Sequence, residues 1–258
     1  MRMNILNMEG IAPKKTVLGK GSFGTVIAAE SGKEPAVVKR IYPVVNRHSQ
    51  GFTPLLPNLL SRKERETYQY KLEKLMQELL IIFLLGNCCI VPCLINIDFS
   101  VITYEDSFEF AMEKCEPLDF RTLDLESFER DLVGALEFMH SIHIIHGDIK
   151  EQNILFSPRL KKYVFVDFGC SRVLREGKGQ PTLINGYFGS WDYLSPEMLK
   201  VANSEDKKGF VDLYENDRHA LRITLKRVSN QKIGNSSYSP IIFWLENVYD
   251  LSPFKTLC

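Results

Sequence analysis

The residues best suited to chemistry are concentrated in one stretch of the second half of the chain. Asp148, Lys150 and Asn153 share the run HGDIKEQN, and Asp167 opens the triplet DFG fourteen positions after Asn153. Carboxylate and amide oxygens are ligands that Mg²⁺ prefers, and a lysine can neutralise a phosphate oxygen. These residue types are capable of binding a metal ion or a phosphate, and taken alone they leave the chemistry open.

A glycine-rich run near the start of the chain could also bind phosphate. The segment GKGSFGTV, residues 19–26, fits the pattern GxGxxGxV, in which glycines let the backbone approach phosphates closely. A dinucleotide-binding loop would continue into a helix, whereas Thr25, Val26 and Ile27 are β-branched and favour a strand. The run therefore favours a hairpin over nucleotide phosphates, with an ordinary glycine-rich hairpin as the alternative when it is taken alone.

Together these motifs resemble those of the protein kinase family. HGDIKxxN stands where the family has HRDLKxxN, DFG follows it, and Ser195-Pro196-Glu197 stands where the family has APE. The similarity covers roughly residues 16–225, with the motifs in the family's order. Single triplets of this kind occur by chance, whereas the ordered set is specific. The resemblance implies a two-lobed fold that transfers a phosphoryl group from ATP to a protein substrate.

The resemblance also implies a role for each matched residue. Asp148 would accept or orient the proton of the attacking hydroxyl, and Lys150 would neutralise the γ-phosphate. Asn153 and Asp167 would hold Mg²⁺. A lysine two positions after the aspartate resembles the serine/threonine branch of the family. His146 would be structural rather than a catalytic base.

Lys39 is expected to direct its ammonium at the α- and β-phosphates from the end of the predicted strand AVVK. Its expected counter-ion is Glu78 on a predicted helix, with Glu73 as the competing choice. The Lys39–Glu78 separation is longer than usual in the family, and we assign the excess to residues 41–61, interpreted as a loop insertion. The predicted nucleotide contacts are Leu18, Gly19, Lys20, Gly21, Ser22, Phe23, Gly24, Thr25, Val26, Lys39, Glu113 and Cys115.

Residues 112–115 align with the hinge of the family. Main-chain groups of Glu113 and Cys115 would bond the adenine edge, Met112 would be the gatekeeper, and Asp119 could reach the ribose. If the fold were different, the same segment would be a linker without ligand contacts.

Hydrophobic periodicity predicts the elements that would position these residues. The expected fold class is α+β: an N-lobe of small antiparallel sheet and one main helix, and a larger, truncated, mainly helical C-lobe. One kinase domain would span residues 1–258, with the N-lobe at 14–113, the hinge at 114–118 and the C-lobe at 119–258. Strands are predicted within 16–39 (three), at 94–102, 107–112, 153–156 and 163–166, and helices at 62–85, 125–142 and 214–228.

One departure from the family's pattern concerns phosphorylation. Gly147 stands where many kinases carry the arginine that binds a phosphate on the segment between DFG and APE. Activation by phosphorylation of this segment is therefore not expected. Thr182 is interpreted as a surface loop hydroxyl, and Ser190 as a contact of Asp148 and Lys150.

A second departure lies near the end of the chain. The run VANSEDKKGF, residues 201–210, is an insertion before Asp217. Asp217 would either bond the catalytic-loop backbone or act as a helix N-cap. Because only 41 residues follow Asp217, the C-lobe is expected to be minimal. Compact kinases with an altered HRD triplet are known among viral enzymes, so a viral origin is one possibility.

Composition restricts the remaining classes of protein. The chain has 258 residues, 45% of them hydrophobic and 25% charged, which is typical of a globular protein. A net charge of zero favours neither nucleic acid nor an anionic membrane as a partner. No apolar run has the length of a membrane span or signal peptide, so an intracellular, reducing compartment is expected, cytoplasm or nucleus, of the host cell if viral. The six cysteines show no zinc or disulfide pattern and are interpreted as free thiols.

Three functions are compatible with these observations. The leading hypothesis is an active serine/threonine kinase that uses ATP and Mg²⁺. It rests on the presence of the complete set Lys39, Asp148, Asn153 and Asp167. A pseudokinase that only binds nucleotide or a partner is the alternative, and it would more often lack one of those groups. A kinase of small molecules ranks last, because such enzymes typically lack the GxGxxGxV run.

Overall fold

The computed structural model describes residues 11–21, 24–41, 62–86, 88, 90–92, 94–98, 108–175 and 179–233. The chain divides into two compact units. The first comprises residues 1–116 and 156–171, and the second comprises residues 117–155 and 172–258.

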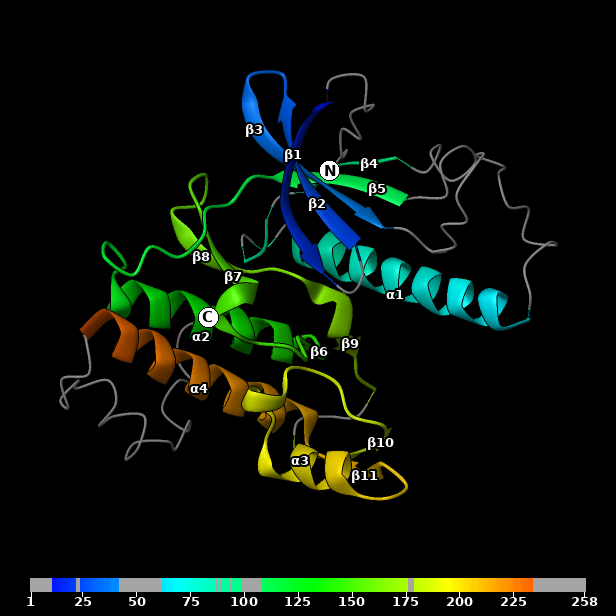
Figure 1. Cartoon of the computed structure of the whole chain (residues 1–258). Coiled ribbons are helices and arrows are strands. Elements are labelled where there is room, and N and C mark those ends of the chain that lie inside the picture. The colour runs from blue at the N-terminus through cyan, green and yellow to red at the C-terminus, as the bar shows by residue number, and fades with distance from the viewer. Residues whose placement is uncertain are drawn as a thin grey trace. The chain divides into compact units, whose positions relative to one another are not determined.

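The first unit is built on a five-stranded antiparallel sheet with the strand order β1-β2-β3-β5-β4 (Figure 1). Ala36 and Val38 of the central strand are fully buried, and Ala29 and Ala111 pack with them across the neighbouring strands. Val37 and Lys39, which point to the other face, are buried as well, so β3 is covered on both faces, as expected of a central strand. The strands are β1 (Ile11–Gly21), β2 (Gly24–Ser31), β3 (Glu34–Ile41), β4 (Leu94–Asp98) and β5 (Phe108–Glu113).

The three strands predicted within residues 16–39 are confirmed, although β1 begins earlier, at Ile11. A two-residue turn joins β2 to β3, and its Gly32 has the left-handed φ of 63° that such turns require. Residues 42–61 and 99–107, which include most of the predicted insertion, lie outside the described residues.

The first unit contains one long helix, α1 (Arg62–Gly86), as the periodicity predicted. Leu75, Leu79, Ile82 and Leu85 repeat at helical spacing and are buried. Glu78 lies in the same stripe and is 2% exposed. The packing of this stripe therefore places a carboxylate inside the first unit.

Three helices form most of the second unit: α2 (Leu125–Ser141), α3 (Pro196–Asn203) and α4 (Leu213–Ile233). In α2 the residues predicted to face the core are buried, and Asp124 caps the helix by accepting the amide N–H of Glu126. The α4 helix, drawn in orange in Figure 1, packs against α2 and extends five residues beyond its predicted end. The eight-residue α3 was not predicted, because so short a helix carries little periodicity; it begins at a Ser195 cap followed by Pro196.

Short strand pairs complete the described fold. The strands β7 (Ile154–Ser157) and β8 (Lys162–Phe165) were predicted to within one residue, and the structure pairs them as a hairpin. Two further pairs were not predicted: β6 (Ile144–Ile145) with β9 (Arg172–Val173), and β10 (Thr182–Asn185) with β11 (Lys208–Val211). The fold class is thus α+β, with an antiparallel sheet in one unit and mainly helices in the other.

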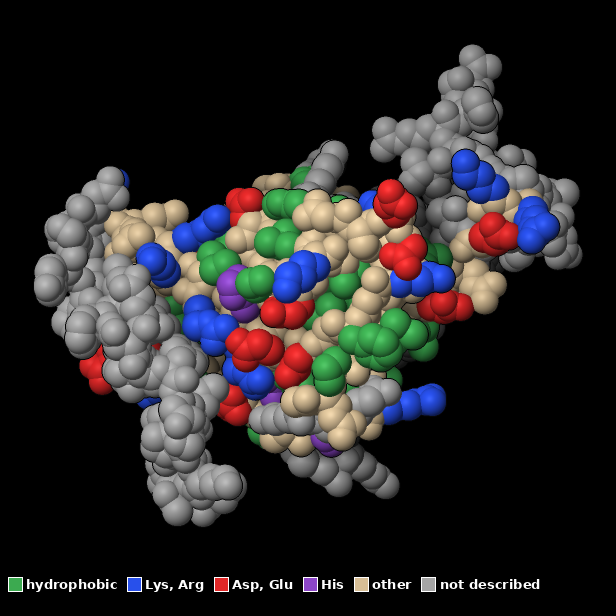
Figure 2. Space-filling model, turned by 90° about the horizontal axis from the view of Figure 1, so that it is seen from below, with side chains coloured by type: hydrophobic (Ala, Val, Ile, Leu, Met, Phe, Trp, Pro, Cys, Tyr) green, Lys and Arg blue, Asp and Glu red, His purple; other side chains and the backbone are tan. Residues whose placement is uncertain are grey.

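The described surface carries charges of both signs. Acidic and basic side chains are interspersed on the face shown in Figure 2 and do not separate into patches of one sign. Within the described residues, no helix combines the length and apolar character needed to cross a membrane.

Candidate active site

In the first unit, Lys39 meets two carboxylates. Lys39 lies in β3, where it pairs with Val26 of β2 and Phe110 of β5, and its side chain is 9% exposed. The ammonium donates to Glu78 Oε1 and lies 3.1 Å from Asp167 Oδ1. Burial lowers the pKa of Lys39, but the charges of Glu78 and Asp167 outweigh it, so the pKa lies above its ordinary value.

The expected Lys39–Glu78 pair is therefore present, and the competing choice is wrong. Glu73 lies on the exposed side of α1, where its carboxylate accepts a hydrogen bond from Gln69. Helical spacing explains the difference, because Glu78 shares the buried stripe with Leu75 and Leu79, whereas Glu73 does not.

The DFG triplet has an unusual backbone. Asp167 has φ 64° and ψ 74°, a left-handed conformation that is rare for a residue other than glycine and is often found at functional sites. Phe168 is buried beside α1, and Gln77 of α1 donates to the Ser171 carbonyl oxygen at 2.6 Å. The helix that carries Glu78 therefore also positions the residues that follow Asp167.

The glycine-rich run forms the predicted hairpin. The backbone pairs Gly19 with Val26, Lys20 with Thr25 and Gly21 with Gly24. The third glycine continues into a strand, which excludes a dinucleotide-binding strand-to-helix turn. Leu18 is 48% exposed beside the hairpin, and the predicted contacts Ser22 and Phe23 lie outside the described residues.

The segment after β5 is tied to the β7–β8 hairpin. The Glu113 carboxylate accepts hydrogen bonds from the Ser157 hydroxyl and, at 2.6 Å, from Arg159 Nε. Glu116 and Phe156 exchange both backbone hydrogen bonds at 2.8 Å. Ser157 and Arg159 were missed, because nothing in their spacing from Glu113 indicates a contact.

The predicted adenine-binding segment also contains a buried thiol. Burial, followed by the charge of Glu113, raises the pKa of Cys115 to about 12. The thiol is therefore protonated at neutral pH, and its Sγ lies 3.6 Å from Glu113 Oε1. Among the described residues, Cys88, Cys115 and Cys170 are thiols that are not joined in disulfide bonds.

In the second unit, Asp148 lies at the centre of a polar cluster. Lys150 Nζ is 2.7 Å from both Asp148 Oδ2 and Ser190 Oγ, as the sequence predicted for Ser190. Asn153 Nδ2 donates to the carbonyl oxygen of Asp148 at 2.8 Å and to its Oδ2 at 3.0 Å. Asp148 Oδ1, in contrast, is buried without a hydrogen-bond partner in the described part of the chain.

The same cluster sets the protonation of Asp148. Burial raises its pKa, but hydrogen bonds from Lys150 and Ser190 and the charge of Lys150 outweigh burial and lower the pKa below its ordinary value. Asp148 is therefore ionised at neutral pH and presents an unpaired acceptor oxygen. An unpaired buried acceptor is costly unless a ligand or water completes it.

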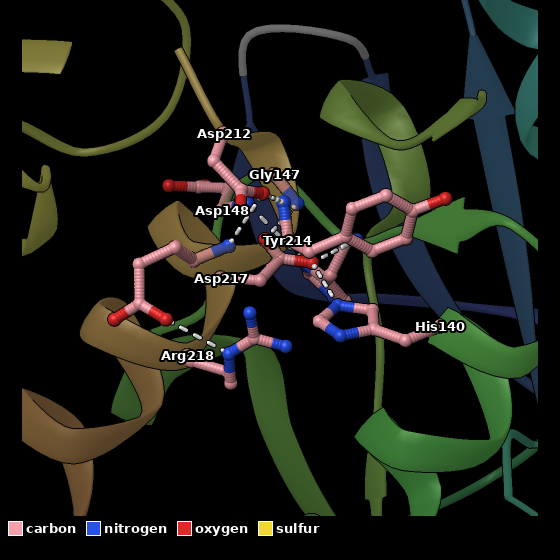
Figure 3. Close-up of polar contacts among 9 residues, drawn as sticks. His140, Gly147, Asp148, Asp212, Tyr214, Asp217 and Arg218 are labelled. Atoms are coloured by element: carbon pink, nitrogen blue, oxygen red, sulfur yellow. Dashed lines mark hydrogen bonds and ion pairs between the residues drawn. The ribbon is translucent and has the colours of Figure 1, made fainter. Parts of the chain in front are cut away.

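Asp217, which is 1% exposed, positions the catalytic loop from α4 (Figure 3). Its Oδ2 accepts the His146 amide at 2.7 Å, and its Oδ1 accepts the Gly147 amide at 2.8 Å. Gly147 has φ 79°, which a glycine adopts without strain. Asp217 therefore bonds the loop backbone, and the alternative that it caps the helix is wrong.

Asp212 takes the capping role instead, because its Oδ1 accepts the amides of Tyr214 and Glu215 at 2.9 and 3.1 Å. His140 was missed by sequence reasoning, although its Nε2 lies 3.2 Å from Asp217 Oδ2 and its ring stacks edge-on against Tyr214. His146 is fully buried, and its Nδ1 accepts the Asp148 amide at 3.3 Å, which is consistent with a structural role.

Each unit contains a side chain with an oxygen of the type that Mg²⁺ binds. In the second unit, the hydrogen bonds of the Asn153 side chain are made by its nitrogen, which leaves its amide oxygen available, and in the first unit Asp167 uses one oxygen toward Lys39. Within the described residues, no three His, Cys, Asp or Glu side chains gather into a metal cage. Mg²⁺ usually binds only one or two protein oxygens together with substrate phosphates, so the chemistry of these two side chains fits a magnesium nucleotide.

Comparison with known proteins establishes the family. The family model described as "Protein kinase domain" matches residues 13–216, so the chain belongs to the protein kinase family.

Several kinases are similar over part of the chain. Wall-associated receptor kinase-like 6 of Arabidopsis thaliana is 31% identical over 182 residues, which are 64% of this chain and 27% of that protein. The proto-oncogene serine/threonine-protein kinase mos of Rattus norvegicus is 29% identical over 126 residues, 49% of this chain and 34% of mos. The human serine/threonine-protein kinase/endoribonuclease IRE2 is 32% identical over 101 residues, 38% of this chain and 11% of that protein. The matches thus span about a third or less of these relatives.

Proposed function

We propose that this chain is an ATP- and Mg²⁺-dependent protein kinase that phosphorylates serine or threonine, with Asp148 as its catalytic base. One observation carries the proposal: Asp148 is held by Lys150 and Asn153 through Oδ2 while its Oδ1 is left buried and unpaired. A base must accept a proton at a positioned, unoccupied lone pair, and Oδ1 has that property.

The chain's own residues then have distinct tasks. Asp148 Oδ1 accepts the proton of the substrate hydroxyl. At the same time the hydroxyl oxygen of the substrate bonds to the γ-phosphorus, and the bond between that phosphorus and the oxygen that leaves with ADP breaks. Lys150 neutralises charge on the transferring group, while Lys39, held by Glu78, neutralises the other phosphates. Asn153 and Asp167 would hold Mg²⁺, and bound MgATP would supply the phosphoryl group with its charge partly screened.

The nucleotide would bind at residues 18–26 and at the main chain of Glu113 and Cys115. Under this proposal, residues 14–113 are the N-lobe, 114–118 the hinge and 119–258 the C-lobe of one domain. The serine/threonine preference is supported by Lys150, whose ammonium bridges Asp148 and Ser190 where a small aliphatic hydroxyl would approach. Protein substrates and a reducing intracellular compartment remain predictions.

The test is transfer of labelled γ-phosphate from MgATP to generic serine, threonine and tyrosine substrates. Wild type is compared with Asp148→Asn, which keeps the shape but not the base, and with Lys39→Met. Transfer to serine or threonine that both substitutions abolish is the expected result. Folded wild type that binds ATP without transferring phosphate would favour a pseudokinase, and transfer to tyrosine alone would overturn the specificity.

A further inference from the structure

The insertion at residues 201–210 supplies a strand to the segment that carries Ser190. Within the second unit, β11 pairs with β10 in the register Thr182–Val211, Leu183–Phe210, Ile184–Gly209 and Asn185–Lys208. The Gly186 amide also donates to the Lys207 carbonyl oxygen at 2.6 Å. We call this β10–β11 pair the ribbon. In the ribbon, backbone hydrogen bonds join residues 182–186 to residues 207–211.

The inner face of the ribbon is packed into the second unit. Ile184 and Val211 are 2% and 1% exposed, and they belong to a cluster with Leu194, Met198 and Val201. The outer face is different, because Leu183 and Phe210 are 62% and 67% exposed. The ribbon therefore has one anchored face.

Close packing at Gly209 determines how near the ribbon approaches α3. A Cβ atom at position 209 would lie 2.6 Å from Val201 Cγ2, a distance that normal packing does not allow. Any residue larger than glycine must push either the ribbon or Val201 away. Gly209 is therefore a point at which the ribbon can be displaced without touching the predicted catalytic residues.

The chain after the ribbon leads directly to the catalytic cluster. Only three residues separate Gly186 from Ser190, and within them Phe188 lies under the Arg172 guanidinium at 3.9 Å. At Gly189, a Cβ atom would lie 2.6 Å from the Gly147 carbonyl oxygen. Ser190 then accepts from Lys150, which also bonds Asp148. Displacement of the ribbon would be transmitted to Ser190 over this short, tightly packed connection.

Gly147 offers no group that could bind a phosphate in this arrangement. It has no side chain, and its backbone N–H is already donated to Asp217 Oδ1. Thr182, predicted as a surface loop hydroxyl, instead lies in β10 with its Oγ1 buried, so that prediction is wrong. Modification of Thr182 would require the ribbon to open.

We propose that β11 is a positioning element for phosphoryl transfer: it holds the segment that carries Ser190 in its working position, so activity requires no phosphate on residues 179–195. The proposal rests on the proposed function above. It assigns to the insertion a task that nothing in the motif pattern indicates.

The test compares three variants in protein that has been freed of phosphate by a phosphatase and checked by mass spectrometry. Gly209→Ala displaces the ribbon, Gly209→Ala with Val201→Ala restores the space, and Phe210→Ala is the matched control on the exposed face of the same strand. We expect Gly209→Ala to lower kcat/KM for the protein substrate by on the order of 10- to 100-fold, because small misplacements near a reacting group are costly. The KM for ATP should not change.

The other expected results follow from the same geometry. The double variant should recover much of the lost activity, and Phe210→Ala should keep the activity of wild type. Amide hydrogen exchange at residues 182–186 should be faster in Gly209→Ala than in wild type or the double variant.

Two outcomes would overturn the proposal. One is phosphate-free wild type that gains activity only when residues 179–195 become phosphorylated. The other is Gly209→Ala that exchanges its ribbon amides rapidly and yet transfers phosphate as fast as wild type. If wild type transfers no phosphate in any state, the proposed function fails. Amide hydrogen exchange at residues 182–186 tests β11 separately: a rate in Gly209→Ala equal to that of wild type would contradict the holding role of β11.

Discussion

Glu78 in the first unit and Asp217 in the second are both buried carboxylates, but the fold stabilises them in different ways. Glu78 is 2% exposed and meets the ammonium of Lys39. Asp217 is 1% exposed and meets two backbone amides and the ring of His140. The first carboxylate depends mainly on one other side chain, besides a backbone hydrogen bond at Phe168, whereas the second depends mainly on the path of the main chain. A charge pair can therefore be broken by one substitution on either side, while the partners of Asp217 persist as long as the loop is folded.

The largest expected effect tests the charge pair. Lys39→Met leaves Glu78 buried without its counter-ion and should reduce the free energy of unfolding by about 3–5 kcal/mol, measured in denaturant. Lys39→Met combined with Glu78→Leu removes both charges and should regain most of this loss, while phosphate transfer stays absent. If the double variant were no more stable than Lys39→Met, the charge pair would not be what stabilises Glu78.

A smaller effect is expected at the backbone-held carboxylate. Asp217→Asn keeps one acceptor oxygen but turns an N–H group toward buried donors, and it should cost about 1–3 kcal/mol of stability together with a fall in kcat. Asp212→Asn is the matched control, because asparagine caps a helix about as well as aspartate. Equal losses in the two variants would show that the buried position of Asp217 has no special importance.

The pH dependence of kcat/KM tests the hydrogen bonds that lower the pKa of Asp148 in the second unit. As the proposed base, Asp148 would accept a proton only when ionised, so kcat/KM should be constant at neutral pH and fall as the pH drops through the lowered pKa of Asp148. Ser190→Ala removes one of the hydrogen bonds that lower this pKa, so the acid limb should move to higher pH. Ser141→Ala, at the exposed end of α2, should leave the limb in place. An acid limb unchanged by Ser190→Ala would mean that Asp148 does not titrate as the base.

The smallest effect is expected at Thr182. Its buried hydroxyl has no partner among the described residues, so the nearly isosteric Thr182→Val should leave activity intact and change stability by no more than about 1 kcal/mol, in the stabilising direction. Thr224→Val is the comparison, because the buried Thr224 hydroxyl donates to the Ala220 carbonyl oxygen at 2.9 Å. Both variants would be compared by calorimetric unfolding. A Thr182→Val variant less stable than Thr224→Val would contradict the assignment of the Thr182 hydroxyl as unpaired among the described residues.

Much of the scaffold was predictable because long elements repeat their pattern many times. The α1 and α2 helices and the hairpins β1–β2 and β2–β3 follow from periodicity and turn residues, and the strands β7 and β8 were predicted without their pairing. The candidate site residues were recognisable because motif spacing within each run is local. The two-residue strand β9 and the eight-residue helix α3 contain too few repeats to be distinguished from loops.

The amino-acid sequence by itself determined the family, the long elements and the residue types at the candidate site. Only the tertiary structure decided that Glu78 rather than Glu73 meets Lys39, that Asp217 and His140 support the catalytic loop, and that the insertion pairs with β10. The physical reason is that these contacts join residues far apart in the chain. Their partners are selected by which faces become buried when the chain packs. Helical spacing separates Glu78 from Glu73, but local spacing does not indicate the partners of Asp217, His140 or the insertion.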